Sequence, residues 1–233
     1  TVAKYYPYAR FKTHEGNTTI FMLDEFTKGG DWVKNMRHPM LEVFRPRLGD
    51  LSVPEGTLVT LTGNLDSDGV GDGLAKHTRQ RIVELIIRKP DATEWLRWAA
   101  NNNIAAVLMA WVDRYRYCLA SYLDGVTNEF NFNPAEPQSN VVSPRTLEQA
   151  SRQILTREHV SKNALRAALT GTVGASAAVS ILSFIEFQDK LPSLKDILDK
   201  PATAEIPDDE GARAVLTFNL LEHVQKDTLT NIM

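Results

Sequence analysis

The sequence of 233 residues contains a single cysteine, Cys118, and no long apolar run. One cysteine excludes an intrachain disulfide and a cysteine-rich zinc site. Because Cys118 falls within an amphipathic helical pattern, we expect it to pack in a core rather than to act as a nucleophile. No stretch approaches the ~20 apolar residues of a membrane span, and the first residues lack the apolar segment of a signal peptide. We therefore expect a cytoplasmic protein with no membrane partner.

A strong excess of charge of either sign is also lacking. The formal net charge is −3, with 24% charged residues, which gives no electrostatic reason to expect nucleic acid as a partner. The five histidines are scattered without the spacing of metal ligands. The apolar fraction of 43% is that of an ordinary globular protein. The length allows one large domain or two small ones.

The first ~90 residues alternate between strand-like and helix-like patterns. Short apolar runs predict three buried strands, at residues 19–23, 57–62 and 81–88. Between the first two, helical spacing predicts a helix from Trp32 to about Phe44, with Asp31 as its N-cap and Pro39 as a conflict within it. Residues 48–56 read as a short polar hairpin-like connection. Strands that alternate with helices predict a parallel α/β sheet.

Helical periodicity dominates after Pro90. The pattern predicts helices at residues 91–101, 104–123, 143–155, 157–169, 175–188, 194–198 and 210–226. We place a domain boundary near Lys89-Pro90. The predicted parts are an α/β domain over residues 1–89, an all-α domain over residues 90–205 and a C-terminal helix over residues 206–233. We expect that last helix to dock on the all-α domain rather than on a partner.

Two adjacent carboxylates, Asp24 and Glu25, directly follow the first predicted strand. At such a strand end an aspartate can hold the Mg²⁺ that bridges nucleotide phosphates, and a neighbouring glutamate can deprotonate the attacking water. The alternative is a solvated strand terminus. Asn64 follows the second strand in the same way, where its amide could position water beside a phosphate. The alternative for Asn64 is an ordinary turn residue.

Three arginines are further candidates. Arg79 and Arg81 lie at the start of the third predicted strand, from which an arginine could reach the phosphates of a neighbouring subunit. The alternative is surface charge. Arg145 lies in the first turn of a helix that begins at Ser143-Pro144. Since the helix dipole disfavours a cation at this end, Arg145 could serve an external anion, or it could pair with Glu148.

The order and spacing of these segments resemble the AAA+ ATPases, specifically the MoxR-like branch. In that family the run from Met22 to Phe26 would be the Walker B strand, Leu61 to Asn64 sensor 1, and Leu74 to Ile82 the arginine-finger segment. Ser143 to Glu148 would be sensor 2, at the start of a lid helix. Residues 91–99 and 168–175 are similar to two other lid helices, so that the resemblance covers roughly residues 15–200.

The resemblance implies the C-terminal part of a parallel-sheet AAA+ nucleotide-hydrolase core, followed by an all-α helical lid. It implies ATP and Mg²⁺ as cofactors, with ATP hydrolysis coupled to remodelling of a protein partner in the manner of a chaperone. Asp24 would hold Mg²⁺, Glu25 would be the general base, Asn64 would orient water, and Arg145 would contact the phosphates from the lid.

The same resemblance implies a homo-oligomer, a hexameric ring in which Arg79 or Arg81 acts on the neighbouring subunit. A von Willebrand factor A-type protein is the client that the family suggests. The usual arginine–phenylalanine pair is replaced here by Arg81-Ile82, so both arginines stay candidates for the finger.

One motif of the family is absent from this sequence. The phosphate-binding loop G-x-x-x-x-G-K-[ST] does not occur, and in such folds it lies at a position upstream of Thr1. We therefore expect the chain to begin partway into a longer protein. If the native polypeptide instead begins near Thr1, the alternative is a non-catalytic AAA+-shaped assembly or binding protein.

Overall fold

The computed structural model describes residues 19–28, 30–42, 44–48, 51–53, 55–64, 74–133, 135, 139–191, 197, 199–200 and 203–222. The chain divides into two compact units, Thr1–Ile87 and Arg88–Met233. The first unit mixes strands with short helices and the second is all-α. None of the helices in the described ranges has the length and apolar character that a membrane span needs.

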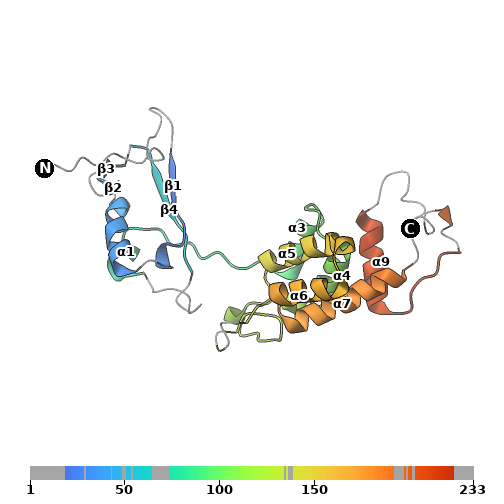
Figure 1. Ribbon diagram of the computed structural model, residues 1–233. Helices are drawn as coiled ribbons and strands as arrows, with labels where there is room; N and C mark the ends of the chain where they lie inside the picture. Colours follow the sequence, from blue (N-terminus) through green and yellow to red (C-terminus); the bar gives the residue numbers. More distant parts are fainter. Residues whose placement is uncertain are drawn as a thin grey trace. The chain divides into compact units, whose positions relative to one another are not determined.

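The first unit contains a two-stranded parallel sheet (Figure 1). Strand β1 (Ile20–Leu23) pairs with β4 (Leu58–Leu61), in a register that sets Ile20 opposite Leu58 and Leu23 opposite Leu61. Both strands lie within the ranges that the apolar runs predict, but the predicted burial is wrong. Ile20, Met22 and Leu58 are 55–65% exposed, because no other described element covers that face of the sheet. Because the strands are parallel, their carboxyl ends lie at the same edge of the sheet.

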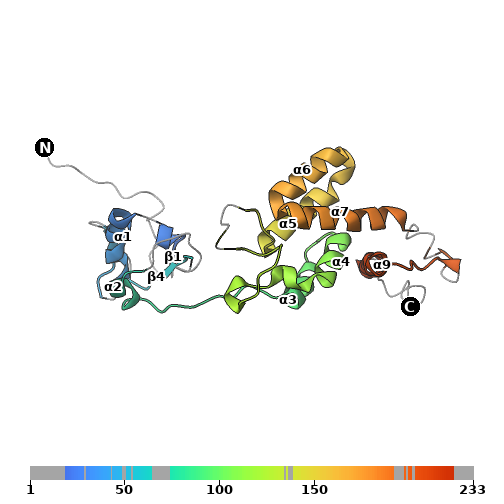
Figure 2. The same ribbon diagram turned by 90° about the horizontal axis from the view of Figure 1, so that it is seen from below.

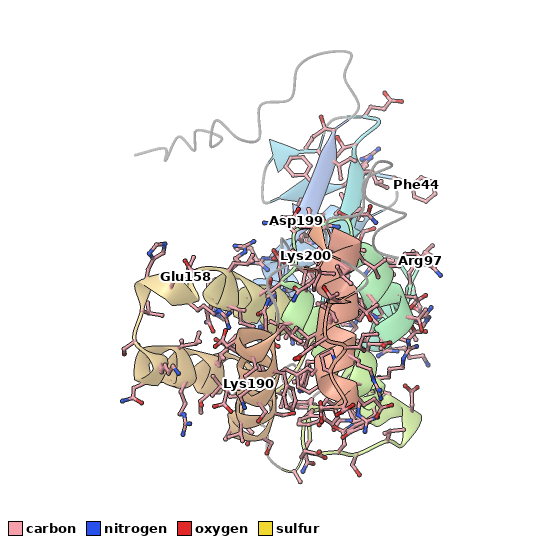
Figure 3. All side chains as sticks on the ribbon, turned by 90° about the vertical axis from the view of Figure 1, so that its right-hand side faces the viewer. Phe44, Arg97, Glu158, Lys190, Asp199 and Lys200 are labelled. Carbon is pink, nitrogen blue, oxygen red and sulfur yellow. The ribbon has the colours of Figure 1, made fainter. Side chains whose placement is uncertain are left out.

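The helix between these strands is shorter than its pattern predicts. Helix α1 (Asp31–Arg37) has Gly30 rather than Asp31 as its N-cap residue. It is followed by a tighter 3₁₀ helix, η3 (His38–Leu41), with Pro39 in its first turn. Proline has no N–H for an α-helical hydrogen bond, which explains the change of helix type. The predicted extension to Phe44 is wrong, since that ring is 94% exposed and points away from its unit (Figure 3).

The hairpin-like connection is confirmed. Strands β2 (Arg47–Leu48) and β3 (Leu51–Ser52) pair in antiparallel fashion.

The third predicted strand, residues 81–88, is wrong. Helix α2 (Lys76–Arg79) is followed by an irregular segment that forms no strand. Four apolar side chains of this segment are 73–87% exposed: Val83, Leu85, Ile86 and Ile87. An apolar run becomes a strand only when another strand accepts its backbone hydrogen bonds, and the described residues supply none here. The glycine- and aspartate-rich residues 66–73 lie outside the described ranges.

Within the described ranges, the second unit packs six helices of eight residues or more (Figures 1 and 2). They are α3 (Ala92–Ala99), α4 (Ala106–Arg114), α5 (Pro144–Leu155), α6 (Lys162–Val173), α7 (Ala175–Lys190) and α9 (Glu210–Glu222). Residues 106–112 of α4 are all buried, as expected for a helix that is apolar on every side. Helices α3, α7 and α9 pack against α4, so the C-terminal helix belongs to this unit.

The predicted helix at residues 104–123 breaks at Tyr115, where the backbone turns to φ −112° and ψ 54°. Two short 3₁₀ helices follow, η5 (Arg116–Leu119) and η6 (Tyr122–Asp124). The break brings Tyr115 and Tyr117 against Phe130, with ring centroids 5.8 and 5.6 Å apart. Tertiary packing of aromatic rings therefore overrides the helical periodicity.

Two other helices also differ from their predicted ranges. Residues 157–169 split into a 3₁₀ helix, η7 (Arg157–His159), and α6, which Ser161 caps and which continues to Val173. The predicted helices at residues 194–198 and 210–226 lie partly outside the described ranges. Cys118 is fully buried, as predicted, and burial raises the pKa of its thiol to about 12, which leaves no reactive thiolate near neutral pH.

Candidate functional site

Acidic and amide side chains follow β1 and β4 at the edge of the sheet where both strands end. Asp24 and Glu25 follow β1, and Thr62 and Asn64 follow β4. The Thr62 hydroxyl donates to Asp24 Oδ1 over 2.5 Å and accepts from the Glu25 backbone N–H over 3.0 Å. The Phe26 backbone N–H donates to the Thr62 carbonyl over 2.8 Å. The two strand ends are therefore tied together through Thr62, and the sequence patterns did not single out that residue.

Glu25 has an unusual backbone conformation for a residue other than glycine, with φ of 52°. Such outliers concentrate at functional sites, where the surrounding structure holds them in place. The Glu25 carboxylate pairs with Lys28 Nζ at 2.7 Å, and both side chains are well exposed. An exposed pair of this kind is worth about 0.2–1 kcal/mol. The carboxylate can therefore leave Lys28 for a substrate at little cost.

The close approach of Asn64 to the 3₁₀ helix η2 (Phe26–Lys28) favours a glycine before it. A Cβ on Gly63 would lie 2.6 Å from Thr27 Cγ2, which is too close for any other residue without movement of Thr27. The Asn64 backbone N–H donates to Thr27 Oγ1 over 3.3 Å. Its side-chain amide is exposed and bonds to none of the described residues. That amide is therefore available to a ligand at the sheet edge.

The donors at this edge suit Mg²⁺ held together with a nucleotide. Mg²⁺ is usually bound by one or two carboxylates, while substrate phosphates and waters complete the coordination. Asp24 supplies one carboxylate, which Thr62 orients. Within the described ranges, no three His, Cys, Asp or Glu side chains gather as a metal cage, so a metal at Asp24 would depend on its ligand's oxygens.

The two candidate finger arginines have different surroundings. Arg81 contacts His38, with its Nη1 2.8 Å from the ring Nε2, and its Nη2 lies 3.0 Å from Glu42 Oε1. Arg79 contacts the Leu74 carbonyl at 3.3 Å and a Glu84 oxygen at 3.5 Å. Arg81 is thus held against η3, an element 40 residues away along the sequence.

Arg145 lies in the first turn of α5, in the helical unit, and is exposed. As predicted, Ser143 is the N-cap of this helix and Pro144 its first residue. The alternative pairing of Arg145 with Glu148 does not form, because Glu148 instead accepts from Arg152 Nη2 over 2.5 Å. Arg145 has no hydrogen-bond or ion-pair partner among the described residues, so its guanidinium is available to an anion.

The helical unit also has a cavity of about 380 Å³ between η7, α6 and α7. Its lining includes Leu165 and Ile185 and the ion pair of Arg157 with Asp189, at 2.6 Å. None of the predicted site residues lines it.

The chain matches no protein-family model, no curated protein and no solved structure.

Proposed function

We propose that the chain is part of an AAA+ ATP hydrolase of the MoxR-like type, whose ATP turnover remodels a protein partner. The observation that carries the proposal is the parallel pairing of β1 with β4. It brings the carboxylates of Asp24 and Glu25 to the same sheet edge as the free amide of Asn64. An acid that can hold a metal, a base and a polar group that can position water are the parts that phosphoryl transfer to water needs.

Each side chain at the edge has its own role in this proposal. Asp24, oriented by Thr62, would hold Mg²⁺, whose charge would offset that of the phosphates. Glu25 would accept the proton of the attacking water through its carboxylate. Asn64 would orient that water with its side-chain amide. The proposed site also needs a glycine-rich loop that cradles the phosphates, which these 233 residues do not contain.

The arginines complete the proposed site. Arg145 would contact the phosphates from the helical lid, and either Arg79 or Arg81 would act on the nucleotide of a neighbouring subunit. This requires a ring of subunits, for which we propose a hexamer. A von Willebrand factor A-type protein is the proposed client.

Replacing Arg145 with alanine tests the role of the lid. In the longest native form of the protein, Arg145→Ala should lower ATP turnover by about 10- to 100-fold, because a hydrogen bond to a charged group contributes about 1.5–3 kcal/mol. Phosphate release measured at saturating and limiting ATP gives the effect on turnover and on KM.

Arg152→Ala is the matched control, since Arg152 is exposed on the same helix and pairs with Glu148. It should leave turnover unchanged. Equal activity of the two variants would contradict the role of Arg145. If the wild-type protein neither binds nor hydrolyses ATP, the non-catalytic assembly protein becomes the better interpretation.

A further inference from the structure

Arg81 is held by two side chains from a distant part of its unit. Its Nη1 lies 2.8 Å from His38 Nε2 and 3.2 Å from His38 Nδ1, and its Nη2 lies 3.0 Å from Glu42 Oε1. His38 opens η3 and Glu42 directly follows it. The Arg81 side chain is 32% exposed, against 48% for Arg79. The contacts therefore join the segment after α2 to η3.

The contact with His38 requires a neutral imidazole. A guanidinium can only donate hydrogen bonds, so the ring nitrogen that accepts from Arg81 Nη1 must carry a lone pair, and the tautomer decides which of the two nitrogens this is. Partial burial lowers the pKa of His38 below its usual 6.5, the positive charges of Arg81 and His77 lower it further, and Glu42 acts in the opposite direction. The His77 ring lies 4.8 Å from that of His38. Geometry and charge therefore both favour the neutral ring near pH 7.

The contacts with His38 and Glu42 leave part of the Arg81 guanidinium free to bind another ligand. A guanidinium carries five N–H donors, and His38 and Glu42 engage one each on Nη1 and Nη2. The remaining donors keep a fixed direction, because two partners of different chemistry hold the group. Fixing a charged group before its ligand arrives lowers the cost of using it in a transition state.

We propose that His38 and Glu42 are positioning residues that hold Arg81, rather than Arg79, as the arginine offered to the phosphates of a neighbouring subunit. This inference rests on the proposed ATP hydrolase function for its catalytic part.

The contact between His38 and Arg81 also predicts how stability depends on pH. Protonation of His38 removes the acceptor and places a cation beside Arg81. Because folding lowers the pKa, the stability from this contact is present above pH 6.5 and is lost as pH falls from 6.5 through the lowered pKa.

Two variants at His38 test, by their ATP turnover, whether His38 positions Arg81. In the longest native form of the protein, His38→Ala should lower ATP turnover by about 10- to 100-fold without weakening ATP binding. His38→Gln should keep most of the activity, since a glutamine carbonyl also accepts from Arg81, and should flatten the loss of turnover below pH 6.5. His77→Gln is the matched control, because His77 contacts the His38 ring but does not bond to Arg81.

Mixing variant and wild-type subunits tests which arginine acts between subunits. Arg81→Ala subunits should suppress the turnover of the mixture beyond their share, as expected for an arginine finger worth ~10³-fold or more. Arg79→Ala subunits should not. Suppression by Arg79→Ala alone, or full activity of His38→Ala, would overturn the inference.

A titration of the His38 ring by NMR separates this inference from the proposed function. Arg81→Ala should raise the pKa of His38, because one of the charges that lower it is removed. An unchanged His38 pKa would refute the contact even if the protein hydrolyses ATP. A raised pKa in a protein without ATP turnover would leave the contact standing, but would refute both the proposed function and the catalytic role of Arg81.

Discussion

Replacing Glu25 with glutamine is expected to abolish ATP turnover in the longest native form of the protein while leaving ATP binding intact. Glutamine preserves the size of the side chain but cannot accept the proton of water, so turnover should fall at least ~100-fold. Binding should change little, because Asp24 and Thr62 keep their contact and the lost ion pair with Lys28 is exposed and weak. Phosphate release and equilibrium binding of a fluorescent ATP analogue measure the two effects separately.

Glu55→Gln is the matched control for this experiment. Glu55 is exposed in the same unit, and no ion pair joins it to the described residues. It should hydrolyse ATP at the wild-type rate. Wild-type turnover by Glu25→Gln would contradict the role of Glu25 as general base. Loss of both binding and turnover would assign Glu25 to nucleotide binding instead.

The second large effect is expected at Gly174, which joins α6 to α7. Its backbone has φ of 87° and ψ of 162°, a conformation that is essentially restricted to glycine. A Cβ at this position would lie 2.4 Å from the Asn140 carbonyl oxygen. Gly174→Ala should therefore lower the free energy of unfolding of the helical unit by about 2–5 kcal/mol. Urea unfolding followed by circular dichroism measures it, since most helices lie in this unit.

Gly171→Ala is the matched control on the same helix. A Cβ there meets nothing within 4 Å, and alanine favours a helix over glycine by about 0.5–1 kcal/mol. We expect Gly171→Ala to leave the unfolding midpoint unchanged or to raise it. Similar losses in both variants would show that the close approach of Gly174 to Asn140 does not limit stability.

The parts of the fold that local signals determine were predictable. Helix α3 begins after Asp91, near the predicted start at residue 91, where a capping box of Asp91 with Glu94 holds it, and α5 begins after Ser143, as predicted. The ranges of β1 and β4 follow from their apolar runs. In these cases the residues that decide the structure are neighbours in the sequence.

Contacts between residues far apart in the sequence explain where the predicted secondary structure was wrong. Residues 81–88 have the composition of a strand, but strand formation depends on a neighbour that this run cannot specify. The predicted helix at residues 104–123 breaks because Tyr115 packs on Phe130 and Phe184. Neither partner could be identified from the periodicity of the helix itself.

In the candidate site, too, some features could be predicted from neighbouring residues and others depended on distant contacts. That Asp24, Glu25 and Asn64 follow strands that end at a common edge could be predicted, because parallel strands end on the same side of the sheet. The bridging hydroxyl of Thr62 and the contacts of Arg81 with His38 could not, since they depend on side-chain orientations across ~40 residues of sequence. The sequence could not show whether Glu148 pairs with Arg145, because helical spacing does not decide which arginine it binds. In the structure Glu148 pairs with Arg152, and Arg145 is left without that partner.

The most direct test of the central claim is the Mg²⁺ dependence of phosphate release from ATP by the longest native form of the protein. Asp24, Glu25 and Asn64 at one sheet edge predict turnover in the presence of Mg²⁺, its loss when EDTA removes the metal, and its recovery when Mg²⁺ is added back. Absence of both ATP binding and phosphate release with Mg²⁺ present would contradict an ATP-hydrolysing site at this edge.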